Sequence, residues 1–215
     1  MTDPIVIIVD GLDGSGKSSL IPGLVEWLAE KRRRPVQSFR DPGSTPLGEK
    51  IRSLVKNAAE PMEQTTQFLL FCAARAELAT LVNRHLAKGE DVVLDRWWYS
   101  TYAYQGALSI DKKLIRQIAQ ETADLAQYPH SFYLDVSEEV ARKRISLDAE
   151  VRKSSVIKDR FESMDLGFRL RVRENYKELW GGGEAPLDRV DTDPLTPHEV
   201  FIEVTRILAR RLDIR

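Results

Sequence analysis

The chain has 215 residues, of which 42% are hydrophobic and 30% are charged, a composition typical of a globular protein that buries a core. Its 32 Lys and Arg residues nearly balance 33 Asp and Glu residues, for a net charge of −1, which argues against a large nucleic-acid surface. One cysteine excludes an intrachain disulfide, and no signal-peptide pattern or membrane-length apolar run is present. We therefore expect a single domain over residues 1–215, located in the cytoplasm, with neither nucleic acid nor a membrane as partner.

Segments typical of strands alternate with segments typical of helices. The expected strands are short runs rich in β-branched and aromatic residues, at residues 5–9, 35–39, 91–95, 131–135 and 187–190. The expected helices are residues 18–31, 47–57, 64–88, 99–108, 111–125, 138–146 and 160–180, and a last helix that begins at a capping box in residues 196–199. Gly89 is the expected stop of the third helix. This order predicts an α/β fold, with a five-stranded parallel sheet flanked by helices on both faces.

A phosphate-binding loop follows the first expected strand. Residues 11–18 match G-x4-G-K-[ST] in full, between a strand and a helix. Glycines let backbone N–H groups turn around phosphate oxygens, and the N-terminus of the helix adds partial positive charge. In this motif Lys17 reaches the β- and γ-phosphates, and the Ser18 hydroxyl binds Mg²⁺. The residues expected to bind the triphosphate are Gly11, Leu12, Asp13, Gly14, Ser15, Gly16, Lys17, Ser18 and Ser19.

The expected strand at residues 91–95 ends in a carboxylate, Asp95. In enzymes with a phosphate loop, such an Asp lies beside the loop and holds the metal directly or through water. Many strands end in Asp, so this signal gains its weight only from the phosphate loop. Together, Ser18 and Asp95 predict a Mg²⁺ site.

Four segments together resemble the thymidylate kinases: residues 10–19, 39–52, 68–75 and 95–106. The resemblance covers nearly the whole chain. It implies a P-loop NTPase-type sheet with a short lid segment, and ATP-dependent phosphorylation of dTMP to dTDP with Mg²⁺. It also implies a homodimer whose other partners are the small molecules dTMP and ATP.

Three residues of these segments are candidates for binding the acceptor nucleotide. Arg40 follows a strand, at the edge where open α/β sheets bind ligands, and a guanidinium there suits a monophosphate; a surface salt bridge is the alternative. Phe71 and Arg75 are four residues apart and share a helix face. The resemblance implies that they stack on thymine and bind its carbonyl edge, whereas core packing is the alternative for Phe71.

Further candidates lie around the expected phosphate loop and the fourth segment. A cation at Arg96 suits the space between donor and acceptor phosphates, where it neutralises charge during transfer. Gln105 offers both amide groups to a base edge, and Ser100 is expected in the same site. The resemblance implies that Tyr104 packs against the sugar C2′, with core packing as the alternative. It implies that Asp13, a carboxylate in an anion-binding loop, accepts the sugar 3′-hydroxyl.

A lid is expected at about residues 147–160, a polar segment between two helices. Gly14 follows Asp13, so the chain resembles the subgroup in which the lid, not the phosphate loop, supplies a phosphate-binding arginine. The candidates are Arg142, Arg144, Arg152 and Arg160. Of these, Arg160 is expected to be catalytic and Arg142 to bind ATP, while a solvated charged face is the alternative.

Departures from the family pattern leave the acceptor open. Trp97 stands where Tyr is frequent, and the pair Trp97-Trp98 is placed to reshape the acceptor pocket. A kinase of the same fold that acts on another deoxynucleotide or nucleoside is therefore one alternative. A P-loop switch or assembly ATPase is a second. Against it, the guanine-reading Asn-Lys-x-Asp pattern is absent and Leu12 stands where partition ATPases have a second lysine.

Overall fold

The computed structural model describes residues 3–57, 61–127, 129–152, 161, 164–182 and 187–214, with the backbone alone for residues 148–152. Five strands form one sheet in the order β2-β3-β1-β4-β5, and all neighbours are parallel. The strands are β1 (Val6–Gly11), β2 (Val36–Arg40), β3 (Asp91–Asp95), β4 (His130–Asp135) and β5 (Leu187–Asp191). All six residues of the central strand β1 are buried, which explains its unbroken apolar sequence.

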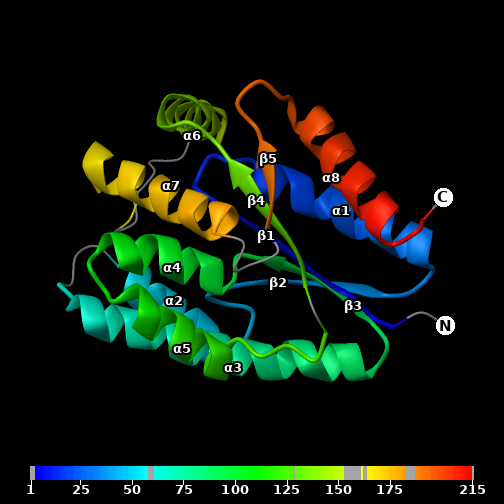
Figure 1. Ribbon diagram of the computed structural model, residues 1–215, viewed down its shortest axis with the longest axis horizontal. Coiled ribbons are helices and arrows are strands. Elements are labelled where there is room, and N and C mark those ends of the chain that lie inside the picture. Colours follow the sequence, from blue (N-terminus) through cyan, green and yellow to red (C-terminus); the bar gives the residue numbers. More distant parts are fainter. Residues whose placement is uncertain are drawn as a thin grey trace.

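Helices cover both faces of this sheet, as expected (Figure 1). They are α1 (Lys17–Arg32), α2 (Pro46–Lys56), α3 (Gln64–Ala87), α4 (Trp98–Ala107), α5 (Lys112–Thr122), α6 (Glu138–Arg152), α7 (Leu166–Gly181) and α8 (Pro197–Arg211). Successive side chains of a strand point to opposite faces, so β1 contributes to two cores. Ile7 and Val9 pack with residues of α1 and α8, whereas Val6 and Ile8 belong to the core that includes α3, α4 and α7. In the described residues, no helix is long and apolar enough to cross a membrane.

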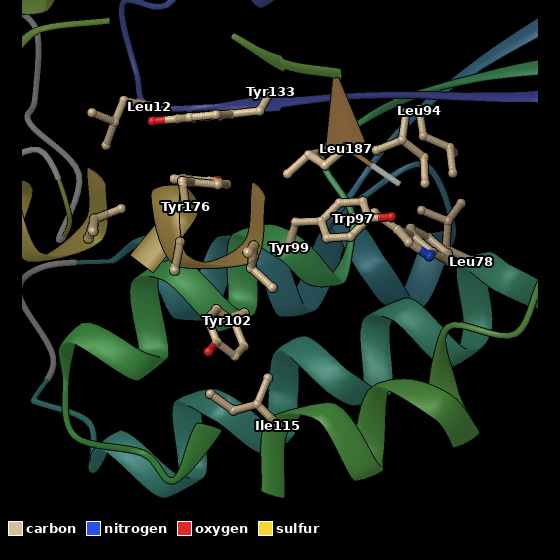
Figure 2. Packing of buried hydrophobic residues seen from close by; sticks show 14 of the residues in the cluster. Leu12, Leu78, Leu94, Trp97, Tyr99, Tyr102, Ile115, Tyr133, Tyr176 and Leu187 are labelled. Carbon is tan, nitrogen blue, oxygen red and sulfur yellow. The ribbon is translucent and has the colours of Figure 1, made fainter. Parts of the chain in front are cut away.

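Aromatic side chains fill much of the core beneath α4 and α7 (Figure 2). The Tyr133 ring of β4 stacks on the Tyr176 ring of α7, with centroids 4.7 Å apart and planes 13° apart. Trp97 and Tyr102 are 1% and 0% exposed. This packing joins α4 and α7 to the sheet beside the phosphate loop, so the elements that carry the site have a rigid base.

Helix ends follow the sequence signals. In the confirmed capping box of α8, the Thr196 side chain accepts from Glu199 N, and Glu199 accepts from Thr196 N. Gly89 follows α3 with φ 79° and donates to Leu86 O over 2.9 Å, the left-handed conformation expected of a glycine stop.

Two predicted boundaries were wrong. The helix expected to end at Ser146 continues to Arg152 as α6, because residues 146–152 contain no Gly or Pro and include helix-forming Leu, Ala, Glu and Arg. The helix expected from residue 160 begins instead at Leu166, where Asp165 accepts from Phe168 N over 2.7 Å and caps it. The rest of the expected lid, residues 153–160, lies outside the described residues.

Register brings the predicted site to the carboxyl edge of the sheet. Arg40 of β2 pairs with Asp95 of β3, and Asp95 pairs with Val9 of β1. The end of β1 leads into the phosphate loop at Gly11. Three segments far apart in sequence therefore converge where open α/β sheets bind ligands.

Candidate functional site

A cavity of about 600 Å³ opens at this edge, between the phosphate loop, the ends of β2 and β3, and helices α3 and α4. The sequence-predicted residues that line it are Asp13, Gly14, Ser15, Gly16, Lys17, Ser18, Ser19, Arg40, Phe71, Arg75, Asp95, Arg96, Ser100, Tyr104, Gln105 and Arg144. Gly11 ends β1 and Leu12 belongs to the hydrophobic core behind the loop. Nearly all the proposed residues thus share one cavity, of the size that small-molecule sites have.

Two glycines of the phosphate loop are required by close backbone contacts. Gly11 has φ 147°, and a Cβ there would lie 2.5 Å from Leu134 O of the neighbouring strand β4. Gly14 has φ 82°, and a Cβ there would lie 2.7 Å from Ala141 O of α6. A side chain at either position would clash with backbone as well as strain φ, so the loop has its shape because these residues are glycine.

Lys17, the first residue of α1, lies within the loop. Its Nζ donates to Gly11 O over 3.0 Å and to Leu12 O over 2.9 Å. Burial lowers the pKa of Lys17 to about 8, helped by the charge of Arg96 and opposed by nearby carboxylates. The ammonium group is therefore placed for phosphate oxygens, but near pH 8 it is only partly protonated.

Arg96 connects the phosphate loop to α4. Its Nη1 donates to Gly11 O and to Ser100 Oγ, each over 2.9 Å, and its Nη2 lies 2.6 Å from Asp13 Oδ1. The guanidinium also lies 5.3 Å from the centroid of the Tyr104 ring. Burial acts to raise the pKa of Asp13, but the charges of Arg96 and other cations outweigh it and lower that pKa to about 2. The Asp13 carboxylate, although it lies in an anion-binding loop, is thus ionised and paired.

The buried Asp10 carboxylate connects the phosphate loop to α4 and α7 through hydrogen bonds. The sequence did not predict this role. Its Oδ1 accepts from Gly11 N over 2.9 Å, Ser100 Oγ over 2.7 Å and Tyr176 OH over 2.6 Å. Its Oδ2 accepts from Trp97 N over 3.0 Å. One buried carboxylate therefore joins β1, α4 and α7. The one sequence signal for this role of Asp10 is its position at the end of an apolar strand.

Arg75 enters the cavity from α3 and is held by two partners. Its Nε lies 2.7 Å from Asp41 Oδ2, and its Nη2 donates to Thr101 Oγ1 over 2.5 Å. Burial raises the pKa of Asp41, although the Arg75 charge opposes this effect. Trp97, expected to reshape the acceptor pocket, is buried, and its ring lies 5.9 Å from the Arg75 guanidinium. Trp97 thus supports Arg75 from beneath.

The apolar wall of the cavity is aromatic. Phe71 of α3 and Tyr104 of α4 both line it, as predicted, and Phe161 lies against each of them. The Phe161 ring centroid is 6.0 Å from that of Phe71 and 5.6 Å from that of Tyr104, edge-on in the second case. The sequence placed Phe161 at the start of an expected helix, residues 160–180, and gave no signal that its ring lines the site.

Arg40 forms an ion pair at the surface and also lines the cavity. Its side chain is 44% exposed and lies 3.3 Å from Glu49 Oε1, as a surface salt bridge would. It also lines the cavity. Such an exposed ion pair is weak, so Arg40 remains available to an anionic ligand.

The lid arginines are placed differently from one another. Arg144 lines the cavity, and its guanidinium donates to Gly14 O over 3.4 Å and to Thr192 O over 2.6 Å. Arg142 is 71% exposed and pairs with Glu138 over 3.6 Å; it is not among the described residues that line the cavity. The side chain of Arg152 and all of Arg160 lie outside the described part of the chain.

A divalent cation fits one corner of the cavity. Asp95 Oδ1 is buried and has no hydrogen-bond partner among the described residues, and Ser18 lines the same cavity. In the described ranges, this corner included, no group of three or more His, Cys, Asp or Glu side chains is placed to hold a metal. A cation here would therefore need ligand phosphate oxygens as well, as Mg²⁺ does in triphosphate sites.

The cavity is cationic. The acidic side chains that line it are Asp13, Asp41 and Asp95. The basic ones are Lys17, Arg40, Arg52, Lys56, Arg75, Arg96 and Arg144. Seven against three leaves an excess of positive charge that attracts phosphorylated ligands.

Comparison with known proteins gives a consistent result. Residues 9–194 match the family model described as thymidylate kinase. A relative named thymidylate kinase from Chlorobium chlorochromatii is 38% identical over 183 residues, which cover 81% of each chain. Another from Chlorobaculum tepidum is 35% identical over 205 residues, 93% of this chain and 94% of the relative. The crystal structure of thymidylate kinase from Ehrlichia chaffeensis covers 96% of this chain and 99% of its own, with a TM-score of 0.74 and 26% identity.

Proposed function

This chain belongs to the thymidylate kinase family, and we propose that it transfers the γ-phosphoryl group of ATP to dTMP, which yields dTDP and ADP. The observation that carries the proposal is the single cavity in which the phosphate loop faces Phe71, Arg75 and Gln105, with Arg96 between the two ends. A triphosphate and a nucleoside monophosphate would meet there end to end. A switch or assembly ATPase has no need of the second half of this cavity.

For ATP, the proposed ligands are the loop residues Gly11 to Ser19. Lys17 would contact the β- and γ-phosphates, while Ser18 and Asp95 would hold Mg²⁺ together with phosphate oxygens. When bound, the cation supplies charge neutralisation to the transferring group. The unpartnered Asp95 Oδ1 supports this assignment.

For dTMP, Phe71 offers a ring face to the base and Arg75 offers donors to its carbonyl edge. Arg40 suits the monophosphate because its partner Glu49 is solvent-exposed and held only weakly. Tyr104 would lie against the sugar, and Asp13 would accept from its 3′-hydroxyl. Both line the cavity beside Arg96.

The protein's part in the reaction is positioning and charge neutralisation, because phosphoryl transfer needs little covalent help. Arg96 is the proposed centre of this work: its guanidinium is held between Gly11 O, Asp13 and Ser100, so it needs little reorganisation as charge develops. A lid arginine would add a second cation. Arg160 and Arg142 remain our predictions for that part, and Arg144 is the candidate that lines the cavity.

The decisive experiment is a coupled assay of ADP formation with ATP and Mg²⁺, and with dTMP, dUMP, dCMP, dGMP or thymidine as acceptor. We expect dTMP to give the highest kcat/KM. If dTMP does not stimulate ADP formation and another acceptor does, the assignment of dTMP as substrate is wrong, and only the assignment of the protein as a kinase is retained. Hydrolysis that no acceptor stimulates would favour a switch or assembly ATPase.

Three expectations from the sequence remain part of the proposal. We infer a homodimer, supported by a long helix α3 that is apolar on more than one face, with Leu69 52% exposed. We also retain the cytoplasm as the location, and small nucleotides rather than nucleic acid or membranes as partners.

A further inference from the structure

Helices α3 and α4 meet through two pairs of buried polar side chains beside the cavity. Arg75 Nη2 donates to Thr101 Oγ1 over 2.5 Å, and Gln105 Nε2 donates to Gln67 Oε1 over 3.4 Å. All four residues are 2% exposed. On α3, Gln67 and Arg75 lie on one face, two turns apart, with Phe71 between them. The base-stacking ring is therefore bracketed by two polar contacts.

In the second contact, the Gln105 amide donates to the Gln67 amide oxygen. A glutamine amide has a donor end and an acceptor end, and either can face a ligand. Here the NH₂ group is directed to Gln67, and Gln105 Oε1 has no hydrogen bond within the described ranges. Gln105 lines the cavity and Gln67 does not, so with its NH₂ group directed to Gln67 we infer that the carbonyl oxygen is the end that Gln105 offers to a ligand.

Building on the proposed function, we propose that Gln67 is a positioning residue that sets base specificity by holding the Gln105 amide with its oxygen toward the base. Arg75 can only donate, and Gln105 in this orientation turns its acceptor toward the base. Thymine and uracil match this pair, since they carry an acceptor at O4 and a donor at N3–H. Cytosine carries an amino donor at C4 and an acceptor at N3, so it is opposed at both places.

Loss of the Gln67 amide should weaken the discrimination of thymine and uracil from cytosine without preventing nucleotide binding. With no acceptor on α3, the Gln105 amide rotates and offers its NH₂ group to cytosine N3. Arg75 keeps its own partners, Asp41 and Thr101, so discrimination falls but does not vanish. One oriented neutral hydrogen bond corresponds to about tenfold in affinity.

The test compares unmodified protein with Gln67→Met and Gln67→Leu, apolar side chains of similar size. Gln64→Met is the matched control, since Gln64 is an exposed residue at the start of the same helix. Dissociation constants for dTMP, dUMP and dCMP are measured without ATP, and thermal unfolding monitors folding. We expect the dCMP-to-dTMP ratio of dissociation constants to fall about tenfold in both Gln67 variants, and the dUMP-to-dTMP ratio to stay the same.

An unchanged dCMP-to-dTMP ratio in folded Gln67 variants would overturn the proposal, and so would equal falls in the dCMP and dUMP ratios. If the variants do not fold, the unmodified protein still decides, because similar affinities for dTMP and dCMP contradict the proposed orientation. Binding is measured apart from turnover. A chain that binds dTMP selectively but does not phosphorylate it would refute the proposed function and leave this inference standing.

Discussion

At the scale of single residues, Lys17 and Arg96 contact the same carbonyl oxygen, Gly11 O, at 3.0 Å and 2.9 Å. Two cations on one loop oxygen repel each other, and burial adds to the cost of their charge. Asp13 and Asp10, whose carboxylate oxygens lie 2.6 Å and 3.9 Å from the Arg96 guanidinium, offset this cost. An incoming triphosphate would meet a loop whose positive charge is already concentrated and oriented.

Arg96→Ala should therefore reduce turnover by about 10²- to 10³-fold, as removal of one charge-stabilising donor does. The dTMP affinity should change less, since the contact strengthens as charge develops in transfer. Steady-state and single-turnover rates measure the effect. Arg206→Ala is the control, because Arg206 is 55% exposed and pairs with Glu203 on α8. A near-normal rate for Arg96→Ala would remove this residue from the catalytic set.

The lowered pKa of Lys17 leads to a prediction about proton uptake when ATP binds. Since burial lowers its pKa to about 8, the free protein at pH 8 carries Lys17 about half protonated. Bound phosphates would raise this pKa again, so ATP binding at pH 8 should take up about half a proton, and much less at pH 6.5. Calorimetry in buffers of different ionisation enthalpy measures the uptake. Lys17→Arg, which stays charged, should show none, and buffer-independent heats in the unmodified protein at pH 8 would contradict the argument.

At the scale of elements, the sequence predicted every strand and helix of the structure but not all their ends. Strong periodic or unbroken apolar patterns identified β1 and α3, whereas the end of α6 and the start of α7 were misplaced because the polar sequence near these ends carries no clear boundary signal. In the site, motif residues such as Lys17 were found early. Their buried partners Asp10 and Gln67 were not, because hydrogen bonding across elements leaves no local pattern.

The close approach of the phosphate loop to α6 gives a prediction at this scale. Gly14→Ala adds both backbone strain at φ 82° and a Cβ that is 2.7 Å from Ala141 O. It should lower the free energy of unfolding by about 2–3 kcal/mol and impair ATP binding. Gly89→Ala is the matched control, since its φ is 79° but nothing lies within 4 Å of the added Cβ. It should cost only about 1–2 kcal/mol and leave activity intact. If denaturant unfolding shows equal losses of free energy of unfolding for the two variants, α6 shifts to accommodate the added Cβ at residue 14 and the prediction is wrong.

At the scale of the whole molecule, one sheet separates two hydrophobic cores, and strand β1 contributes to both. This shared strand supports our prediction that residues 1–215 fold as one domain. Both termini lie on the side of the molecule away from α6 and the start of α7 (Figure 1). Extensions at either end would therefore leave the cavity accessible.

The predicted homodimer belongs to the same scale. If the exposed side of α3 forms the contact, Leu69→Asp should convert a dimer to a monomer at micromolar concentration, because a charge would be buried against apolar surface. Sedimentation velocity measures the change. Ile202→Asp on α8, where Ile202 is 49% exposed, should leave the dimer intact. A monomeric unmodified protein would refute the prediction.

The backbone of Arg96 has a conformation that is unfavourable for any residue except glycine. Its φ is 72°, a left-handed conformation that costs a non-glycine residue about 1–2 kcal/mol. Glycine would relieve this strain and remove the guanidinium in the same step. A library selected only for thermal resistance would thus tend to enrich Arg96→Gly and lose the proposed catalyst, so stability and activity are opposed at this position.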